Sequence, residues 1–309
     1  MSGRLTLPHP ETAMARLATW KRRQALLAYG LLLPAIAYFA TYFFYPIVVE
    51  LWASLFRGAP LIGEASFAGL DNYVAALTDQ RVQRSLGITL IYAVSTTVIT
   101  LAVALGLAAI LAGPVRANNV IRAVIFFPYI ISFVIVALMW KSLLDPYTGI
   151  LNSILFMLGL PGQNWLGSPQ SALPTMIAIT VWKEIGYAML IYIASIQGVP
   201  QSLYEAASLD GATPRQTFFS VTLPLLAPTT LFLAVISMIS HLQDISAPYL
   251  LTNGGPANST RLYSLHVYEA AFVELNIGYA SALSFLMFIL ILAITFIQFK
   301  LLGRQVSYS

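Results

Sequence analysis

This chain of 309 residues is poor in charge and lacks cysteine altogether. Only 9% of its residues are charged and 58% are hydrophobic, whereas a soluble domain usually has about 25% charged residues. The shortage of charge excludes an ordinary soluble domain and indicates a membrane protein. The absence of cysteine excludes disulfides and thiol chemistry, but it carries no information about compartment.

Several chemical signatures are also missing. A phosphate-binding loop needs Gly-Lys-Ser/Thr, but each lysine of this chain follows an aromatic residue, so we expect no ATP site. The net charge of +4 is not arranged as a basic, aromatic stripe, which argues against nucleic acid. We expect neither a metal nor another cofactor, and no catalytic centre, because the few histidines are scattered: His9, His241 and His266.

Long apolar runs take up most of the chain. A membrane-spanning helix needs roughly 20 mostly apolar residues, and no room remains for a sizeable soluble domain. We therefore predict an all-α membrane protein with six transmembrane helices in residues 25–302, between an N-terminal segment, 1–24, and a tail, 303–309. The predicted spans are residues 25–48, 87–112, 119–141, 173–197, 225–250 and 279–299.

Lys and Arg near the span ends predict the orientation. With both termini in the cytoplasm, the cytoplasmic segments hold 10 of these residues and the outer loops hold 5, as the positive-inside rule requires. The first span is not expected to be a cleaved signal, because it runs on past Tyr45 without a suitable cleavage site. Residues 201–224, between the fourth and fifth spans, should then face the cytoplasm.

The segment 201–224 is polar for so apolar a chain. The patterns S-x-x-E from Ser202 and T-x-x-Q from Thr213 predict capping boxes that start two short helices. Asp210-Gly211 predicts a left-handed end for the first helix. Such a pair of helices either rests on the inner leaflet or docks into a partner, and the residues alone favour neither.

Polar residues also recur within two of the predicted spans. A charged group there costs about 3 kcal/mol, so it usually faces a cavity or a partner. Aromatic faces beside hydrogen-bonding groups suit a sugar. Two polar stripes recur at helical spacing: Thr180, Lys183, Glu184 and Tyr187 in the fourth span, and Ser237, Ser240, His241 and Asp244 in the fifth. The candidate path residues are Trp182, Lys183, Glu184, Tyr187, Ser240, His241, Gln243 and Asp244.

These path residues have alternative interpretations. Lys183 and Glu184 could equally neutralise charged neighbours across a subunit interface. Trp182 could be a packing residue, and His241 could form a hydrogen bond with a nearby helix. Asp244 has the strongest functional case, because we expect its carboxylate to be unpaired within the membrane.

One long motif points to a family. Glu205-Ala206-Ala207, then Gly211, then Val221-Thr222-Leu223-Pro224, resembles the E-A-A-x3-G-x9-I-x-L-P loop of ABC importer permeases, with Val221 in place of Ile. "LDNY", "FFPYIIS", "TNGGP" and "GYASALS" are similar to the carbohydrate-uptake permeases of the maltose and glycerol-3-phosphate group. The resemblance implies a type I ABC importer permease fold whose cytoplasmic loop couples to an ATPase. The implied coupling residues are Glu205, Ala206, Ala207, Asp210, Gly211, Leu223 and Pro224.

The resemblance also implies partners. These are a second homologous permease subunit, two copies of a cytoplasmic ATP-binding subunit, an extracytoplasmic solute-binding protein and the lipid of a bacterial inner membrane. The expected substrate is a sugar. Glycerol-3-phosphate or a glycerophosphodiester is the alternative, disfavoured because Lys183 is the one basic residue away from the ends of the predicted spans that could bind a phosphate. A self-sufficient secondary transporter, with Asp244, His241 and Lys183 as a proton relay, would leave the E-A-A loop unexplained.

Overall fold

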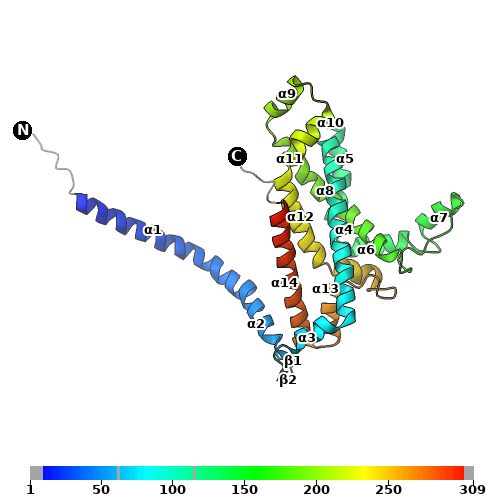
Figure 1. Cartoon of the computed structure of the whole chain (residues 1–309), viewed down its shortest axis with the longest axis horizontal. Helices are drawn as coiled ribbons and strands as arrows, with labels where there is room; N and C mark the ends of the chain where they lie inside the picture. The colour runs from blue at the N-terminus through cyan, green and yellow to red at the C-terminus, as the bar shows by residue number, and fades with distance from the viewer. Residues whose placement is uncertain (1–9, 61–62, 114–115, 303–309) are drawn as a thin grey trace, which may run out of the picture.

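The structure is a computed structural model that describes residues 10–60, 63–113 and 116–302. Almost all regular structure in this part of the chain is helical (Figure 1), which confirms the predicted all-α class. The exception is an antiparallel pair of three-residue strands, β1 (Phe56–Gly58) and β2 (Ala65–Phe67). The predicted tail, 303–309, lies outside the described residues.

Among the described helices, four are long and apolar enough to cross a membrane, or up to six if each of two bent helix pairs counts as one span. The first of them runs from Leu27 to Ala53 with no buried residue in its most apolar stretch. It comprises the end of α1 (Pro10–Phe39), a π-helical turn and α2 (Tyr45–Ala53). Figure 1 shows α1 extending away from the other helices. A helix that is apolar on all faces needs lipid or another subunit around it.

The core pair is α4 (Gln80–Leu111) and α8 (Ala172–Gln197), which match the predicted second and fourth spans. Asp79 caps α4 by accepting a hydrogen bond from the backbone N–H of Arg81 at 2.8 Å. The polar residues 80–84 therefore begin a spanning helix, seven residues before the predicted span 87–112. A separate short helix, α3 (Asp71–Thr78), lies just before it.

The predicted third span, 119–141, is two helices. α5 (Arg116–Ile130) and α6 (Phe133–Leu143) meet at 100°. Pro128 lies in the last turn of α5, which ends at Ile130, so the carbonyls of Pro128 and Tyr129 have no helical N–H partner. Broken backbone at membrane depth is tolerated where other groups satisfy it. Lys183 does so, since its Nζ donates to the carbonyl of Tyr129 at 2.8 Å and of Pro128 at 3.4 Å.

The fifth predicted span, 225–250, is also interrupted. α12 (Ala227–Leu242) ends eight residues early, and it is bent by 62° from the helical stretch Pro214–Leu225 before it. That stretch comprises α10 (Pro214–Thr217), a π-helical turn and α11 (Leu223–Leu225). A second π-helical turn, Pro248–Thr252, follows α12 after a non-helical link.

The remaining helices complete the bundle. α14 (Ile277–Leu302) agrees with the predicted sixth span, 279–299. Its Gly278 lies against the hairpin, where an added Cβ would be 1.9 Å from the carbonyl oxygen of Phe56. Figure 1 places the hairpin and α3 at one end of the molecule, and α9 and α10 at the other. The other helices are α7 (Ile150–Met157), α9 (Gln201–Leu209) and α13 (Tyr263–Tyr268), the last continued by a π-helical turn.

Candidate substrate path and coupling loop

The predicted coupling loop, residues 201–224, begins with α9, but not through the expected capping box. α9 starts at Gln201, with Pro200 as its N-cap and no side-chain cap. Ser202 therefore lies inside the first turn, and its predicted pairing with Glu205 is wrong. The cause is Pro200, whose fixed φ of −56° and extended ψ of 128° start the helix without a side-chain acceptor.

From Asp210 to Gln216, the loop has the structure that its sequence predicts. Asp210 is the C-cap of α9, and Gly211 has the left-handed φ of 73° that favours glycine. The side chain of Gln216 accepts from the backbone N–H of Thr213 at 2.8 Å, and the backbone N–H of Gln216 donates to the Thr213 hydroxyl at 3.4 Å. This reciprocal pair confirms the predicted capping box of α10.

The loop presents apolar side chains at the end of the bundle. No residue of α9 is buried, and Leu209 is 89% exposed. Phe219, beyond α10, is 54% exposed. Behind the loop, Tyr204 and Phe218 line a cavity of about 700 Å³ that reaches the ends of α4 and α8. Exposed apolar groups gathered in this way mark an interaction site.

The two predicted polar stripes meet at a small pocket. It has a volume of about 70 Å³ and lies among α4, α5, α8 and α12. Thr100 and Tyr129 also line it, and neither was predicted from the sequence. Tyr129 had one available signal, because it follows Pro128, and a proline within a predicted helix marks a possible break. The predicted residues at this pocket are Glu184, Tyr187, Ser237 and Ser240.

Two tyrosines and one carboxylate form part of the pocket wall. The rings of Tyr129 and Tyr187 stack with centroids 4.8 Å apart and planes 13° from parallel. The Glu184 carboxylate is 2.8 Å from Nε2 of the buried His241, whose Nδ1 is 2.9 Å from the Thr97 hydroxyl. His241 thus ties α12 to α8 and α4 behind the pocket, as the alternative interpretation expected.

Asp244 does not have the free carboxylate that we expected. It accepts hydrogen bonds from the Tyr92 hydroxyl at 2.6 Å and from the backbone N–H groups of Ser246 and Ala247 at 2.8 and 3.2 Å. The Tyr92 hydroxyl also lies 3.0 Å from that of Thr180. The expectation of an unpaired carboxylate is wrong, because Asp244 caps the helical segment that starts at Ser246, whose first N–H groups need an acceptor.

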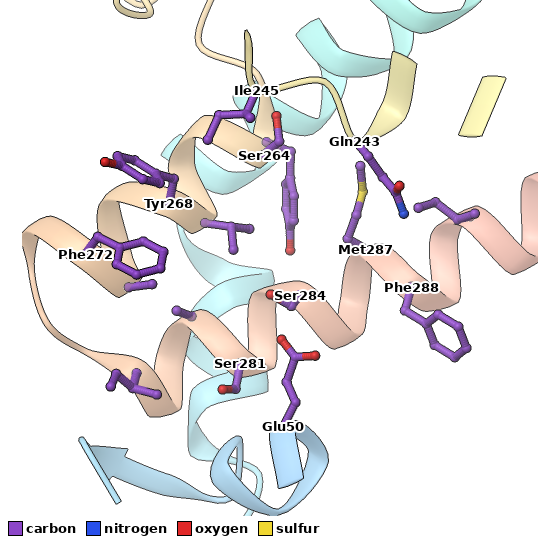
Figure 2. Close-up of a pocket in the computed structure, with 16 residues that line it drawn as sticks. Glu50, Gln243, Ile245, Ser264, Tyr268, Phe272, Ser281, Ser284, Met287 and Phe288 are labelled. Atoms are coloured by element: carbon purple, nitrogen blue, oxygen red, sulfur yellow. The ribbon is translucent and has the colours of Figure 1, made fainter. Parts of the chain in front are cut away.

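Three other predicted path residues lie away from this pocket. Lys183 holds the break between α5 and α6, with its Nζ 5.4 Å from the ring centre of Tyr129. Trp182 packs edge-on against Trp140 at 5.4 Å and lines an apolar groove of about 600 Å³ between α4 and α8. Gln243 lines a separate pocket of about 650 Å³ (Figure 2).

Residues 102–308 match the family described as the binding-protein-dependent transport system inner membrane component. The chain belongs to this family. It is therefore the permease subunit of an ABC importer, a multi-pass protein of the inner membrane, and the predicted resemblance is confirmed. Membership also disfavours the secondary transporter.

Permease proteins of named transport systems match nearly the whole chain. It is 33% identical over 285 residues to the sn-glycerol-3-phosphate transport system permease protein UgpA of Agrobacterium fabrum, covering 92% of this chain and 97% of the relative. It is 33% identical over 287 residues to the trehalose/maltose transport system permease protein MalF of Thermococcus litoralis, covering 92% and 96%.

The fold is similar to a solved importer. A chain of a bacterial ABC transporter involved in the import of the acidic polysaccharide alginate superimposes with a TM-score of 0.80 at 26% identity, covering 94% of this permease and all of that chain. A second structure is an alginate ABC transporter in complex with a pentasaccharide-bound periplasmic protein, with a TM-score of 0.79, 26% identity and coverage of 90% and 95%.

Proposed function

We propose that this permease translocates a neutral sugar, delivered by an extracytoplasmic solute-binding protein and driven by a separate ATP-binding subunit. The observation that carries the proposal is the pocket where Glu184, Tyr187, Ser237 and Ser240 meet beside Tyr129. A carboxylate and hydroxyls supply hydrogen bonds, and the stacked tyrosines supply aromatic surface.

The charge of the pocket favours a neutral solute. Among the described residues that line it, Glu184 is the only charged one, and its carboxylate would repel a phosphate or carboxylate. Lys183 points its Nζ at backbone carbonyls, so it is already engaged. Relatives named for glycerol-3-phosphate and for trehalose/maltose are equally similar to this chain, and the pocket chemistry supports the second kind of substrate.

The size of the pocket supports a second permease subunit. A volume of about 70 Å³ is well below the roughly 300–1,000 Å³ of small-molecule sites. We infer that the path is completed by a second, homologous permease subunit, with two copies of the ATP-binding subunit below. Residues 25–302 would form the permease domain, with both termini in the cytoplasm on the side of the coupling loop.

The test is a binding screen followed by uptake. The solute-binding protein encoded beside this gene is screened with maltose, trehalose and glycerol-3-phosphate. The complex is then reconstituted in proteoliposomes with ATP inside. We expect ATP-dependent uptake of a neutral sugar, and Glu184→Gln should reduce it at least tenfold. Uptake of glycerol-3-phosphate in preference to either sugar would contradict the proposal, and uptake without an ATP-binding subunit would restore the secondary transporter.

A further inference from the structure

A second pocket lies away from the proposed path. Its volume is about 650 Å³, within the range of small-molecule sites. The end of α2, the residues after α12, α13 and the first turns of α14 surround it (Figure 2). It shares no lining residue with the pocket at Glu184, so it needs an explanation of its own.

Four polar side chains in this pocket lack partners. Within the part of the chain that the structure describes, Glu50, Gln243, Ser281 and Ser284 form no side-chain hydrogen bond or salt bridge. In Figure 2 the Glu50 carboxylate points toward Ser284, and the Gln243 amide enters from the opposite side. Ser281 is buried, Glu50 and Ser284 are half-buried and Gln243 is exposed, so a ligand that enters the pocket can reach these polar groups.

Other polar groups at the same pocket are already satisfied. The Tyr263 hydroxyl donates to the carbonyl of Leu283 at 2.8 Å, and the Ser264 hydroxyl donates to the carbonyl of Asp244 at 2.5 Å. The fold therefore pairs the groups that hold its helices together. The four side chains without partners line the same cavity, where their polar groups are free to bind a ligand.

The lining indicates the chemistry of the ligand. Carboxylate, amide and hydroxyl groups bind vicinal hydroxyls, and the aromatic side chains of Tyr268, Phe272 and Phe288 offer surface for the C–H faces of a sugar ring. In the part of the chain that the structure describes, Glu50 is the only charged residue that lines the pocket. We propose that this pocket binds a neutral polyhydroxylated solute, with Glu50 as the residue that selects against anions.

The position of the pocket suggests its place in transport. Ser281 and Ser284 lie in the first two turns of α14, so Ser284 is about 10 Å along the helix axis from its start. Glu50 lies three residues before the end of α2. This end of the molecule is opposite α9 and α10 (Figure 1). We assign the pocket as a vestibule that the solute occupies before it reaches Glu184, and this assignment rests on the proposed function.

The lack of native cysteine allows a direct test. Ser284→Cys places one thiol in the pocket, and Ser95→Cys places one in the apolar groove between α4 and α8 as a control. Both are made in the assembled complex and treated with cationic trimethylammonium-ethyl and anionic sulfonatoethyl methanethiosulfonate. Labelling is followed by the mass of this chain, with and without maltose, trehalose, glycerol or glycerol-3-phosphate.

We expect the cationic reagent to label Ser284→Cys at least fivefold faster than the anionic one, and Glu50→Gln to remove that preference. Maltose should slow labelling, glycerol-3-phosphate should not, and Ser95→Cys should remain unlabelled. Absence of labelling at Ser284→Cys would overturn the proposal in favour of lipid or a helix of another subunit. Labelling that none of the three neutral probes slows would overturn the ligand class.

The same complex separates this proposal from the proposed function. If maltose slows labelling but wild-type complex imports no sugar, the pocket stands as a binding site and the transport proposal fails. If wild-type complex imports sugar and labelling is unaffected by it, the vestibule fails and the importer stands.

Discussion

At the scale of single residues, similar chemistry serves different purposes in this permease. Glu184 borders the pocket where two polar stripes meet, whereas Asp244 accepts three hydrogen bonds, two of them from the first N–H groups of the helical segment after α12. Both are acidic residues in apolar stretches of sequence. Their surroundings make the first a candidate for solute contact and the second a structural cap.

Asp244→Asn tests this division. An amide still accepts from the backbone N–H groups of Ser246 and Ala247, but the charge-assisted bond from Tyr92 is lost. Because hydrogen bonds to charged groups contribute about 1.5–3 kcal/mol, we expect a loss of stability of about 2 kcal/mol, measured by thermal unfolding of the purified complex. Tyr92→Phe should have a similar effect. Loss of uptake with unchanged stability would instead make Asp244 a path residue.

Gly186 provides a test of helix packing. A Cβ at this position would lie 2.4 Å from the backbone oxygen of Ile125 and 2.5 Å from Cα of Phe126, so α5 must move. Gly186→Ala should destabilise the protein by about 1–3 kcal/mol through overpacking. Gly106→Ala in α4 meets no atom within 4 Å and should stabilise it by up to about 1 kcal/mol. Thermal unfolding compares the two; equal effects would contradict the close contact.

At the scale of elements, the coupling loop is two short helices joined at a left-handed glycine. Thr213 and Gln216 fix the start of α10, and Gly211 sets the turn between the helices. Glu205 has no capping role, because α9 starts at Gln201 without a side-chain cap. A role for its charge must therefore come from outside this chain.

Gly211→Pro tests whether the turn aims the loop at the ATPase. Proline cannot adopt the φ of 73° found here, so α10 should be misdirected. We expect insertion to be normal, with ATPase retention and solute-stimulated ATP hydrolysis reduced at least tenfold. Gly159→Pro is the matched control, since Gly159 also has φ of 73° and lies in another loop. Wild-type hydrolysis in Gly211→Pro would indicate that the loop only rests on the membrane surface.

At the scale of the whole molecule, the permease is incomplete alone. The first helix leaves the body and buries none of its apolar stretch, and the pocket at Glu184 has only about 70 Å³. Apolar surface without neighbours and a partial pocket both require more protein or lipid around the chain.

We therefore expect the tagged chain to co-purify with a different permease subunit and two copies of an ATP-binding subunit. Intact-complex mass measurement in mild detergent gives the stoichiometry directly. Deletion of the second permease gene should abolish uptake, because a single chain does not enclose the path. An active complex that contains this permease as a homodimer would contradict this assembly.

The sequence by itself determined the membrane environment, the all-helical class and most of the coupling loop. These features depend on local composition and on short spacings, such as Thr213 to Gln216 and the turn at Gly211. The E-A-A motif pointed to the correct family for the same reason, because its residues lie in one continuous stretch.

Only the tertiary structure decided where the third and fifth spans break and what each buried polar group does. The break at Pro128 is possible because Lys183, 55 residues away in the sequence, supplies donors to the free carbonyls. Asp244 is paired because Tyr92, 152 residues away, reaches it across the bundle. Gln243 lies beside the polar stripe of α12 in the sequence. Because α12 ends at Leu242, however, the Gln243 side chain lines a different pocket. Such partners are set by packing between helices, which periodicity within one helix does not encode.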